Sequence, residues 1–197
     1  MLRILIDDKI PERVSSEMIL ALPQWRREKA EAFRFSSDQW LCARAYQILC
    51  QGLRDEFGIT EMPQFEYGKN GKPSLMGFPD VHFNISHCPR AVAVVISDAP
   101  IGCDVEAVIE DSQLDEDVML HCFNGEEVAE IRGAEHPGVE FTRLWTVKEA
   151  LLKLTGEGLT ENLPKLLSRA DLQDVSIKTT DFGTYVFTIA QRELTLE

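Results

Sequence analysis

Short apolar runs and longer helical stretches alternate along the first half of the chain. Leu2–Asp7 alternates with mostly apolar positions and predicts a first strand. A helical stretch is predicted from Pro11 to Lys29 with an interruption near Pro23, and apolar positions at helical spacing predict a second helix over Gln39–Phe57. The β-rich runs that follow are Val81–Ile85 and Ala91–Ser97.

Capping and turn residues mark the ends of these elements. Ser36-Ser37-Asp38 is an N-cap signal before the long helix, and Gly58 is suited to end it. Lys69-Asn70-Gly71-Lys72-Pro73 has the composition of a turn, because Asn-Gly readily adopts positive φ.

The second half repeats the coarse order of the first. After a break at Asp98-Ala99-Pro100, Ile101–Val105 predicts another strand. The helices and then the strands predicted after it are Asp115–Cys122, Glu126–Arg132, Val139–Thr155, Val175–Thr179 and Thr184–Ala190. The chain is therefore predicted to be α+β, with an N-terminal half over residues 1–97 and a C-terminal half over 98–197.

Composition narrows the class of partner and the compartment. The 197 residues include 20 Lys and Arg against 33 Asp and Glu, a net charge of −13, which argues against nucleic acid as a partner. The longest apolar stretch, Ala91–Ile96, is far shorter than the roughly 20 residues of a membrane span. The N-terminus lacks the pattern of a signal peptide, so we expect no membrane association and a cytoplasmic location. The five cysteines contain no C-x-x-C pair, so a disulfide framework or structural zinc site is not expected.

The run Ile101-Gly102-Cys103-Asp104-Val105-Glu106 places two carboxylates in an apolar strand. Residues two apart on a strand project from one face, so Asp104 and Glu106 point the same way. Side by side they repel each other and lose hydration, which a hard divalent cation such as Mg²⁺ relieves. The alternative is an edge strand with both acids in solvent, and the pair alone does not decide between them.

A later helix carries a third carboxylate and a lysine. Leu144, Val147 and Leu151 mark its core face, while Glu149 and Lys153 are four residues apart and share another face. An ordinary surface salt bridge is one interpretation. The other makes Glu149 a metal ligand and Lys153 a cation for phosphate.

Further polar residues suit a phosphate. Ser86 and His87 end a strand just before Pro89, where binding loops are common. A neighbouring anion would favour the charged form of His87, although a histidine satisfied within the core is the alternative. The basic residues of the first half, which would otherwise belong to a solvated surface, are Arg26, Arg27, Lys29, Arg44, Lys69 and Lys72.

Together these motifs resemble the Sfp-type 4′-phosphopantetheinyl transferases. The matching pieces, in order, are Gly71-Lys72-Pro73, Phe83-Asn84-Ile85-Ser86-His87, Ile101-Gly102-Cys103-Asp104-Val105-Glu106 and Trp145-Thr146-Val147-Lys148-Glu149-Ala150-Leu151-Leu152-Lys153. The resemblance covers about residues 25 to 160. It departs at Gln39-Trp40-Leu41-Cys42, where members of the family often carry further arginine.

The resemblance implies two similar α+β halves related by a pseudo-twofold axis, with coenzyme A between them. The N-terminal half would bind coenzyme A, and the C-terminal half would bind metal and catalyse. Asp104, Glu106 and Glu149 would be the metal ligands. The residues implied in coenzyme A binding are Ser86, His87 and Lys153 at the phosphates, Lys72 at the adenosine end, and Arg26, Lys29 and Arg44 as upstream basic positions.

The activity implied is Mg²⁺-dependent (with Mn²⁺ as an alternative metal) transfer of 4′-phosphopantetheine from coenzyme A to a serine of an apo acyl or peptidyl carrier protein. Glu149 is the candidate general base, Lys153 assists at the phosphates, and 3′,5′-ADP leaves. Lys148 is expected to be exposed beside the site and to contact the carrier, and a monomer is expected. The alternatives are a Mg²⁺-dependent hydrolase of the coenzyme A pyrophosphate and a non-catalytic carrier-protein binder.

Overall fold

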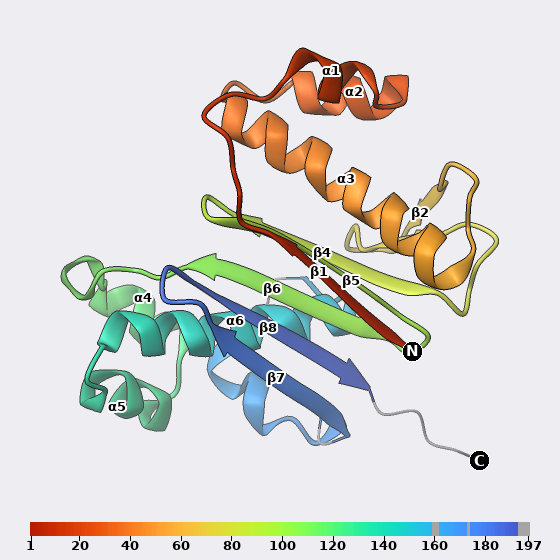
Figure 1. Cartoon of the computed structure of the whole chain (residues 1–197). Coiled ribbons are helices and arrows are strands. Elements are labelled where there is room, and N and C mark those ends of the chain that lie inside the picture. Colours follow the sequence, from red (N-terminus) through yellow and green to blue (C-terminus); the bar gives the residue numbers. More distant parts are fainter. Residues whose placement is uncertain (159–161, 173, 193–197) are drawn as a thin grey trace.

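The computed structural model describes residues 1–158, 162–172 and 174–192. It contains two three-stranded antiparallel sheets with helices on their outer faces (Figure 1). The first sheet is formed by β1 (Leu2–Asp7), β4 (His82–Cys88) and β5 (Ala91–Ser97), and the second by β6 (Ile101–Ala107), β7 (Val175–Asp181) and β8 (Tyr185–Arg192). The helices are α1 (Ser16–Leu20), α2 (Gln24–Glu31), α3 (Ser36–Phe57), α4 (Glu116–Cys122), α5 (Gly125–Gly133) and α6 (Pro137–Thr155).

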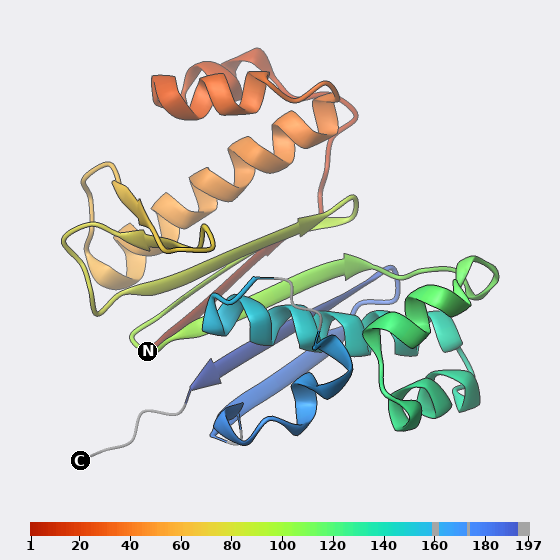
Figure 2. The same ribbon diagram turned by 180° about the vertical axis from the view of Figure 1, so that it is seen from behind.

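The alternation of side chains along β5 explains the layered packing. Val92, Val94 and Ile96 join the core beneath α3, while Ala91, Ala93 and Val95 join a core shared with β6 and β8. All the residues of β5 are buried, as expected of a strand covered on both faces. The order of layers is therefore α3, first sheet, second sheet, α6, and the view from behind shows α6 against the second sheet (Figure 2).

The two halves repeat one connectivity. The order β1, α3, β4, β5 gives the sheet order β1-β5-β4, and β6, α6, β7, β8 gives β6-β8-β7. In each half the last strand is central and the long helix follows the first strand. The α+β class is confirmed, and the shared connectivity is consistent with two similar halves; the twofold axis stays a prediction.

The predicted N-terminal helix is shorter and divided in the structure. Residues before Ser16 are not helical, because the Ser15 side chain accepts from the Met18 amide and starts α1 there. Pro23 is the N-cap of α2, which agrees with the predicted interruption. The helix α3 ends at Phe57, and its C-cap Gly58 has the left-handed φ of 66° expected of a glycine terminator.

The sequence pattern did not predict one β-hairpin of the N-terminal half. The predicted turn around Asn70 joins β2 (Phe65–Tyr67) to β3 (Pro73–Leu75), strands too short to produce a period in the sequence. Gly71 sits in the turn with φ of 82°. Short 3-10 segments at Asp111–Gln113, Leu163–Ser168 and Ala170–Leu172 complete the described elements.

No helix in the described part of the chain is both long and apolar enough to cross a bilayer. The cysteines are free thiols, of which four are buried and Cys50 is half-buried, as expected of small apolar side chains.

Candidate functional site

Three side chains from different elements meet at the junction of the two sheets. The Ser86 hydroxyl of β4 donates to Asp104 Oδ1 of β6 at 2.7 Å. Lys153 Nζ of α6 donates to the same oxygen at 2.6 Å and to Ser86 Oγ at 2.9 Å. Residues 18 to 67 positions apart in sequence therefore form one hydrogen-bonded unit.

Packing of β6 against α6 creates this unit. A Cβ on Gly102 would lie 2.1 Å from the Ala150 carbonyl oxygen, so only glycine allows the strand to approach the helix so closely. Asp104, two residues on, faces the same helix. From the other side, Asn84 Oδ1 accepts from the Cys103 amide at 2.9 Å and aligns β4 with β6.

Two further carboxylates lie close enough to interact electrostatically with Asp104. Burial, with added repulsion from Asp104, raises the pKa of Glu106 to about 7. The same two causes raise the pKa of Glu149. Burial alone would lower the pKa of Lys153, but the charge and hydrogen bond of Asp104 outweigh it and raise that pKa.

The donor chemistry around Asp104 suits a divalent cation. Asp104 is 1% exposed, and its Oδ2 is buried without a hydrogen-bond partner. An unpaired carboxylate oxygen beside two mutually repelling carboxylates is the chemistry that a hard cation relieves. The side chains are not gathered as ligands, since no group of three His, Cys, Asp or Glu in the described ranges is placed to hold a metal ion. Lys153 instead neutralises Asp104.

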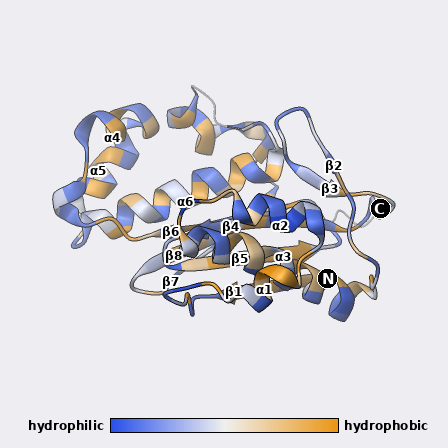
Figure 3. Ribbon diagram, turned by 90° about the horizontal axis from the view of Figure 1, so that it is seen from above, coloured by the Kyte–Doolittle hydropathy of each residue, from blue (hydrophilic) through white to orange (hydrophobic). Residues whose placement is uncertain are grey.

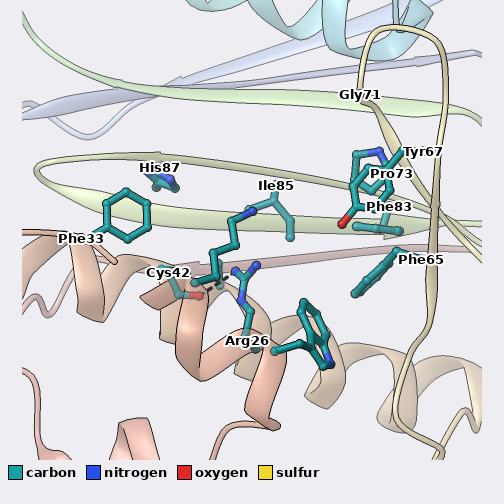
Figure 4. Close-up of a pocket in the computed structure, with 13 residues that line it drawn as sticks. Arg26, Phe33, Cys42, Phe65, Tyr67, Gly71, Pro73, Phe83, Ile85 and His87 are labelled. Carbon is teal, nitrogen blue, oxygen red and sulfur yellow. Dashed lines mark hydrogen bonds between the residues drawn. The ribbon is translucent and has the colours of Figure 1, made fainter. Parts of the chain in front are cut away.

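A cavity of about 260 Å³ is lined by residues of the N-terminal half (Figure 4). Its lining combines aromatic and cationic side chains with His87 at one end. The lining residues are Trp25, Arg26, Lys29, Phe33, Cys42, Ala45, Phe65, Tyr67, Gly71, Pro73, Phe83, Ile85 and His87. Such a lining suits a planar ring that carries an anionic group.

The cations of this cavity come mainly from α2. Arg26 donates to the Cys42 carbonyl at 2.7 Å and its guanidinium lies 5.6 Å from the centre of the Tyr46 ring. Lys29 also lines the cavity and is exposed. Figure 3 shows α2 coloured as hydrophilic along most of its length. The predicted basic positions Arg26 and Lys29 therefore lie together.

Ser86 and His87, predicted to act together on phosphates, face opposite ways because they are neighbours on β4. Ser86 pairs across with Ala93, on the face toward the second sheet, and His87 with Val92, on the face toward α3. Burial and the positive charge of Lys153 lower the pKa of His87. An anion beside the imidazole would act in the opposite direction and favour its charged form.

A second cavity of about 300 Å³ adjoins the first and shares Gly71, Pro73 and Ile85 with it. Glu149 and Lys153 line this second cavity. An elongated ligand could therefore pass from the aromatic cavity to the carboxylates.

Two predicted binding residues have other partners. Lys72 Nζ donates to the carbonyls of Ile101 at 3.2 Å and Leu154 at 2.8 Å, and burial lowers its pKa to about 8. Arg44 pairs with Asp7 at 2.6 Å and does not line either of these two cavities. Their contacts with coenzyme A stay predictions.

The expectation that Lys148 is exposed is wrong. Its side chain is 0% exposed, and Nζ donates to Glu127 Oε2 and to the Leu163 carbonyl, both at 2.7 Å. Lys148 and Glu149 are adjacent on α6, so they project about 100° apart around the helix. Lys148 therefore enters the C-terminal core and is not available to a partner.

Comparison with known proteins gives a consistent result. The profile of the 4′-phosphopantetheinyl transferase superfamily matches residues 100–196. A 4′-phosphopantetheinyl transferase, psf-1 of Bacillus pumilus, is 30% identical over 168 residues, which cover 83% of this chain and 70% of that protein. This chain belongs to the superfamily.

Other relatives in the superfamily agree. A 4′-phosphopantetheinyl transferase of Bacillus subtilis is 29% identical over 157 residues, covering 73% of this chain and 64% of its own length. The 4′-phosphopantetheinyl transferase AcpT of Escherichia coli (strain K12) is 32% identical over 148 residues, covering 73% and 70%. The aligned parts thus span about two thirds of the relatives' length.

Sequence reasoning missed the aromatic walls of the first cavity. Trp25 lies on α2, Phe33 in the loop after it and Tyr67 on β2, so no shared motif links them and only the fold brings them together. Asn84 gave a usable signal, because a buried amide within the β-rich run Val81–Ile85 must find a hydrogen-bond partner.

Proposed function

We propose that this protein transfers the 4′-phosphopantetheine group of coenzyme A to a serine of an apo acyl or peptidyl carrier protein. The observation that carries the proposal is the Ser86–Asp104–Lys153 unit beside Glu106 and Glu149. Lys153 and Glu149 line the second cavity, which adjoins the first. The names of the relatives, all 4′-phosphopantetheinyl transferases, support this activity.

The aromatic cavity would take the adenosine end of coenzyme A. Rings such as Phe65 and Tyr67 offer stacking area for a base, while Arg26 and Lys29 offer cations for a phosphate. His87 at the end of this cavity would gain a proton as the anion binds. The diphosphate and pantetheine arm would then follow the second cavity toward Lys153.

The proposed metal ligands are Asp104, Glu106 and Glu149, with Mg²⁺ (or Mn²⁺) as the ion. When bound, the ion would neutralise the coenzyme A pyrophosphate and stabilise the charge that develops during transfer. Asp104 Oδ2, which has no hydrogen-bond partner, is the oxygen we assign to it. Lys153 holds Asp104 Oδ1 and Ser86 Oγ and would turn its third donor to a phosphate oxygen.

In the proposed reaction the oxygen of the carrier serine forms a bond to the phosphorus that bears the pantetheine arm. The bond from that phosphorus to the oxygen of 3′,5′-ADP breaks. The serine proton passes to Glu149, directly or through one water, and the raised pKa of this carboxyl makes it a better base near neutral pH. Two cavities within one chain are consistent with action as a monomer.

The test is to incubate the protein with coenzyme A, Mg²⁺ and several apo carrier proteins and to weigh each carrier. The expected result is a mass gain of one phosphopantetheine on a serine together with release of 3′,5′-ADP. Breakdown of coenzyme A without that gain would mean a hydrolase, and binding without either product would mean a non-catalytic protein. Both of these results would overturn the proposal.

A further inference from the structure

The tip of the β2–β3 hairpin holds the end of α6. Lys72 Nζ donates to the Leu154 carbonyl at 2.8 Å, and Asn70 Nδ2 donates to the carbonyls of Gly156 at 3.0 Å and Glu157 at 2.9 Å. The hairpin belongs to the N-terminal half and α6 to the C-terminal half, so these bonds cross between the halves. Figure 3 shows the hairpin beside this end of α6.

These donors satisfy groups that a helix cannot satisfy alone. The last carbonyls of a helix have no intrahelical partner and carry its negative dipole end. A lysine and an amide there complete the hydrogen bonding and, for Lys72, complement the dipole. The side chain also packs closely, since a Cβ on Gly156 would lie 3.3 Å from Lys72 Cδ.

Lys72 also reaches the strand that carries Asp104. Its second bond goes to the Ile101 carbonyl, where β6 begins. Ile101 lies three residues before Asp104, and Leu154 lies one residue after Lys153. Lys72 therefore joins the strand and the helix that supply the two partners of the Asp104–Lys153 ion pair.

We infer that Lys72 and Asn70 are positioning residues, which fasten the hairpin to the end of α6 and hold Lys153 and Glu149 in register with Asp104. We call these two side chains the clasp. The inference rests on the proposed transfer activity. Gly71, between the two clasp residues, lines both cavities, so the hairpin that would contact the nucleotide also fixes the catalytic helix.

The first experiment compares Lys72→Met and Asn70→Ala with Glu66→Gln, a control that removes an exposed charge from the same hairpin. In the clasp variants we expect kcat for carrier modification to fall about 10- to 100-fold, while Kd for 3′,5′-ADP changes less than about threefold. The control should change neither. A tenfold weaker Kd for 3′,5′-ADP with unchanged kcat in Lys72→Met would make Lys72 a nucleotide ligand and overturn the inference.

The second experiment tests the clasp without an activity assay. Amide hydrogen exchange in Lys72→Met should quicken at the last turn of α6, residues 152 to 156, with the first turns of α6 unchanged. Uniform quickening along α6, or none, would count against the clasp. This measurement needs no carrier protein, so its outcome does not depend on whether the proposed transfer activity is correct.

A disulfide cross-link between the hairpin and the chain after α6 is expected to restore kcat in a clasp variant. A Cβ on Gly158 would lie 3.7 Å from Asn70 Cβ, within the range of a disulfide. In a Lys72→Met background, oxidised Asn70→Cys/Gly158→Cys should regain at least half of the lost kcat and lose it again under reductant. The φ of 73° at Gly158 adds strain to this cysteine, so Lys72→Arg is the second rescue, expected to recover part of kcat through its own donors. If the disulfide is confirmed by mass and neither variant recovers kcat, the positioning role is wrong.

Discussion

Helix α6 supplies the lysines of two lysine–carboxylate pairs, and these lysines are five residues apart. The two pairs resemble each other closely and differ in their surroundings. Lys148 Nζ lies 2.7 Å from Glu127, and Lys153 Nζ lies 2.6 Å from Asp104. In both pairs the second carboxylate oxygen is buried without a partner. Geometry of the pair alone therefore does not distinguish a structural bridge from a functional one.

The surroundings make the difference. Lys148 is 0% exposed and is enclosed by the Leu163 carbonyl and the ring of Phe123, so its pair can serve only the C-terminal core. Lys153 is 29% exposed and lines a cavity, and the pKa of Glu149 nearby is raised. A buried lysine–carboxylate pair becomes a candidate site where further carboxylates lie nearby and a cavity gives a ligand access to the lysine.

The largest expected effect is a loss of stability at the enclosed Lys148–Glu127 pair. Lys148→Met should lower the free energy of unfolding by about 3 to 5 kcal/mol, because it leaves Glu127 buried and unpaired. Urea denaturation measures it, with the exposed Lys178→Met as control, expected within about 0.5 kcal/mol. If Lys148→Met is too unstable to purify, Lys148→Met/Glu127→Gln should recover part of the loss. A loss below about 1 kcal/mol would remove the contrast between the pairs.

The Lys153–Asp104 pair, which lies beside a cavity, should show the reverse, with a large effect on activity and a smaller effect on stability. Lys153→Met should lower kcat/KM for carrier modification by about 10²- to 10³-fold, the usual effect of removing one charge-stabilising donor. Its unfolding free energy should fall by less than that of Lys148→Met, since Ser86 still donates to Asp104 Oδ1 and Lys153 is itself 29% exposed. Steady-state kinetics and urea denaturation on the same preparation check both. Activity within threefold of the unchanged protein would contradict the proposed role.

Charge repulsion around Asp104 should be visible as a pH dependence of stability. The folded-state pKa of Glu106 is raised to about 7, so its stabilising contribution is complete below its unfolded pKa of 4.5 and is lost as pH rises through 7. In EDTA, Glu106→Gln should be more stable than the unchanged protein by on the order of 1–2 kcal/mol at pH 8 and less so at pH 5.

Addition of Mg²⁺ should reduce that difference, because the ion relieves the repulsion only where the carboxylate is kept. Thermal unfolding checks this, with exposed Glu12→Gln as the matched control. Equal curves for Glu106→Gln and the unchanged protein at pH 8 would mean that these carboxylates do not repel.

The smallest effect concerns His87. Its pKa is lowered in the free protein and should rise beside the bound anion, so binding takes up a proton. Affinity for 3′,5′-ADP should therefore fall by about three- to tenfold as pH rises through the window that spans the ordinary histidine pKa of about 6.5. Calorimetry of the unchanged protein, His87→Gln and the exposed control His121→Gln separates this from titration of the ligand phosphate. Equal slopes for all three would place His87 away from the anion.

Periodicity alone determined much of the secondary structure. Leu2–Asp7 and Ala91–Ser97 were predicted with the bounds of β1 and β5, since alternation and turn residues act locally. The motifs also named Asp104, Glu149 and Lys153 as a group. What the sequence left open was whether Glu149 and Lys153 form a surface salt bridge.

Tertiary structure decided the partners of each charged group, because partners depend on which faces meet. The approach of α6 to β6 at Gly102 directs Lys153 to Asp104, and the packing of α5 on α6 directs Lys148 to Glu127. Helical spacing does not contain this difference. Lys72 looked like a ligand in its motif, yet the fold places its ammonium on two backbone carbonyls. Sequence determined which groups could carry charge, and packing between elements distant in sequence determined what each charge meets.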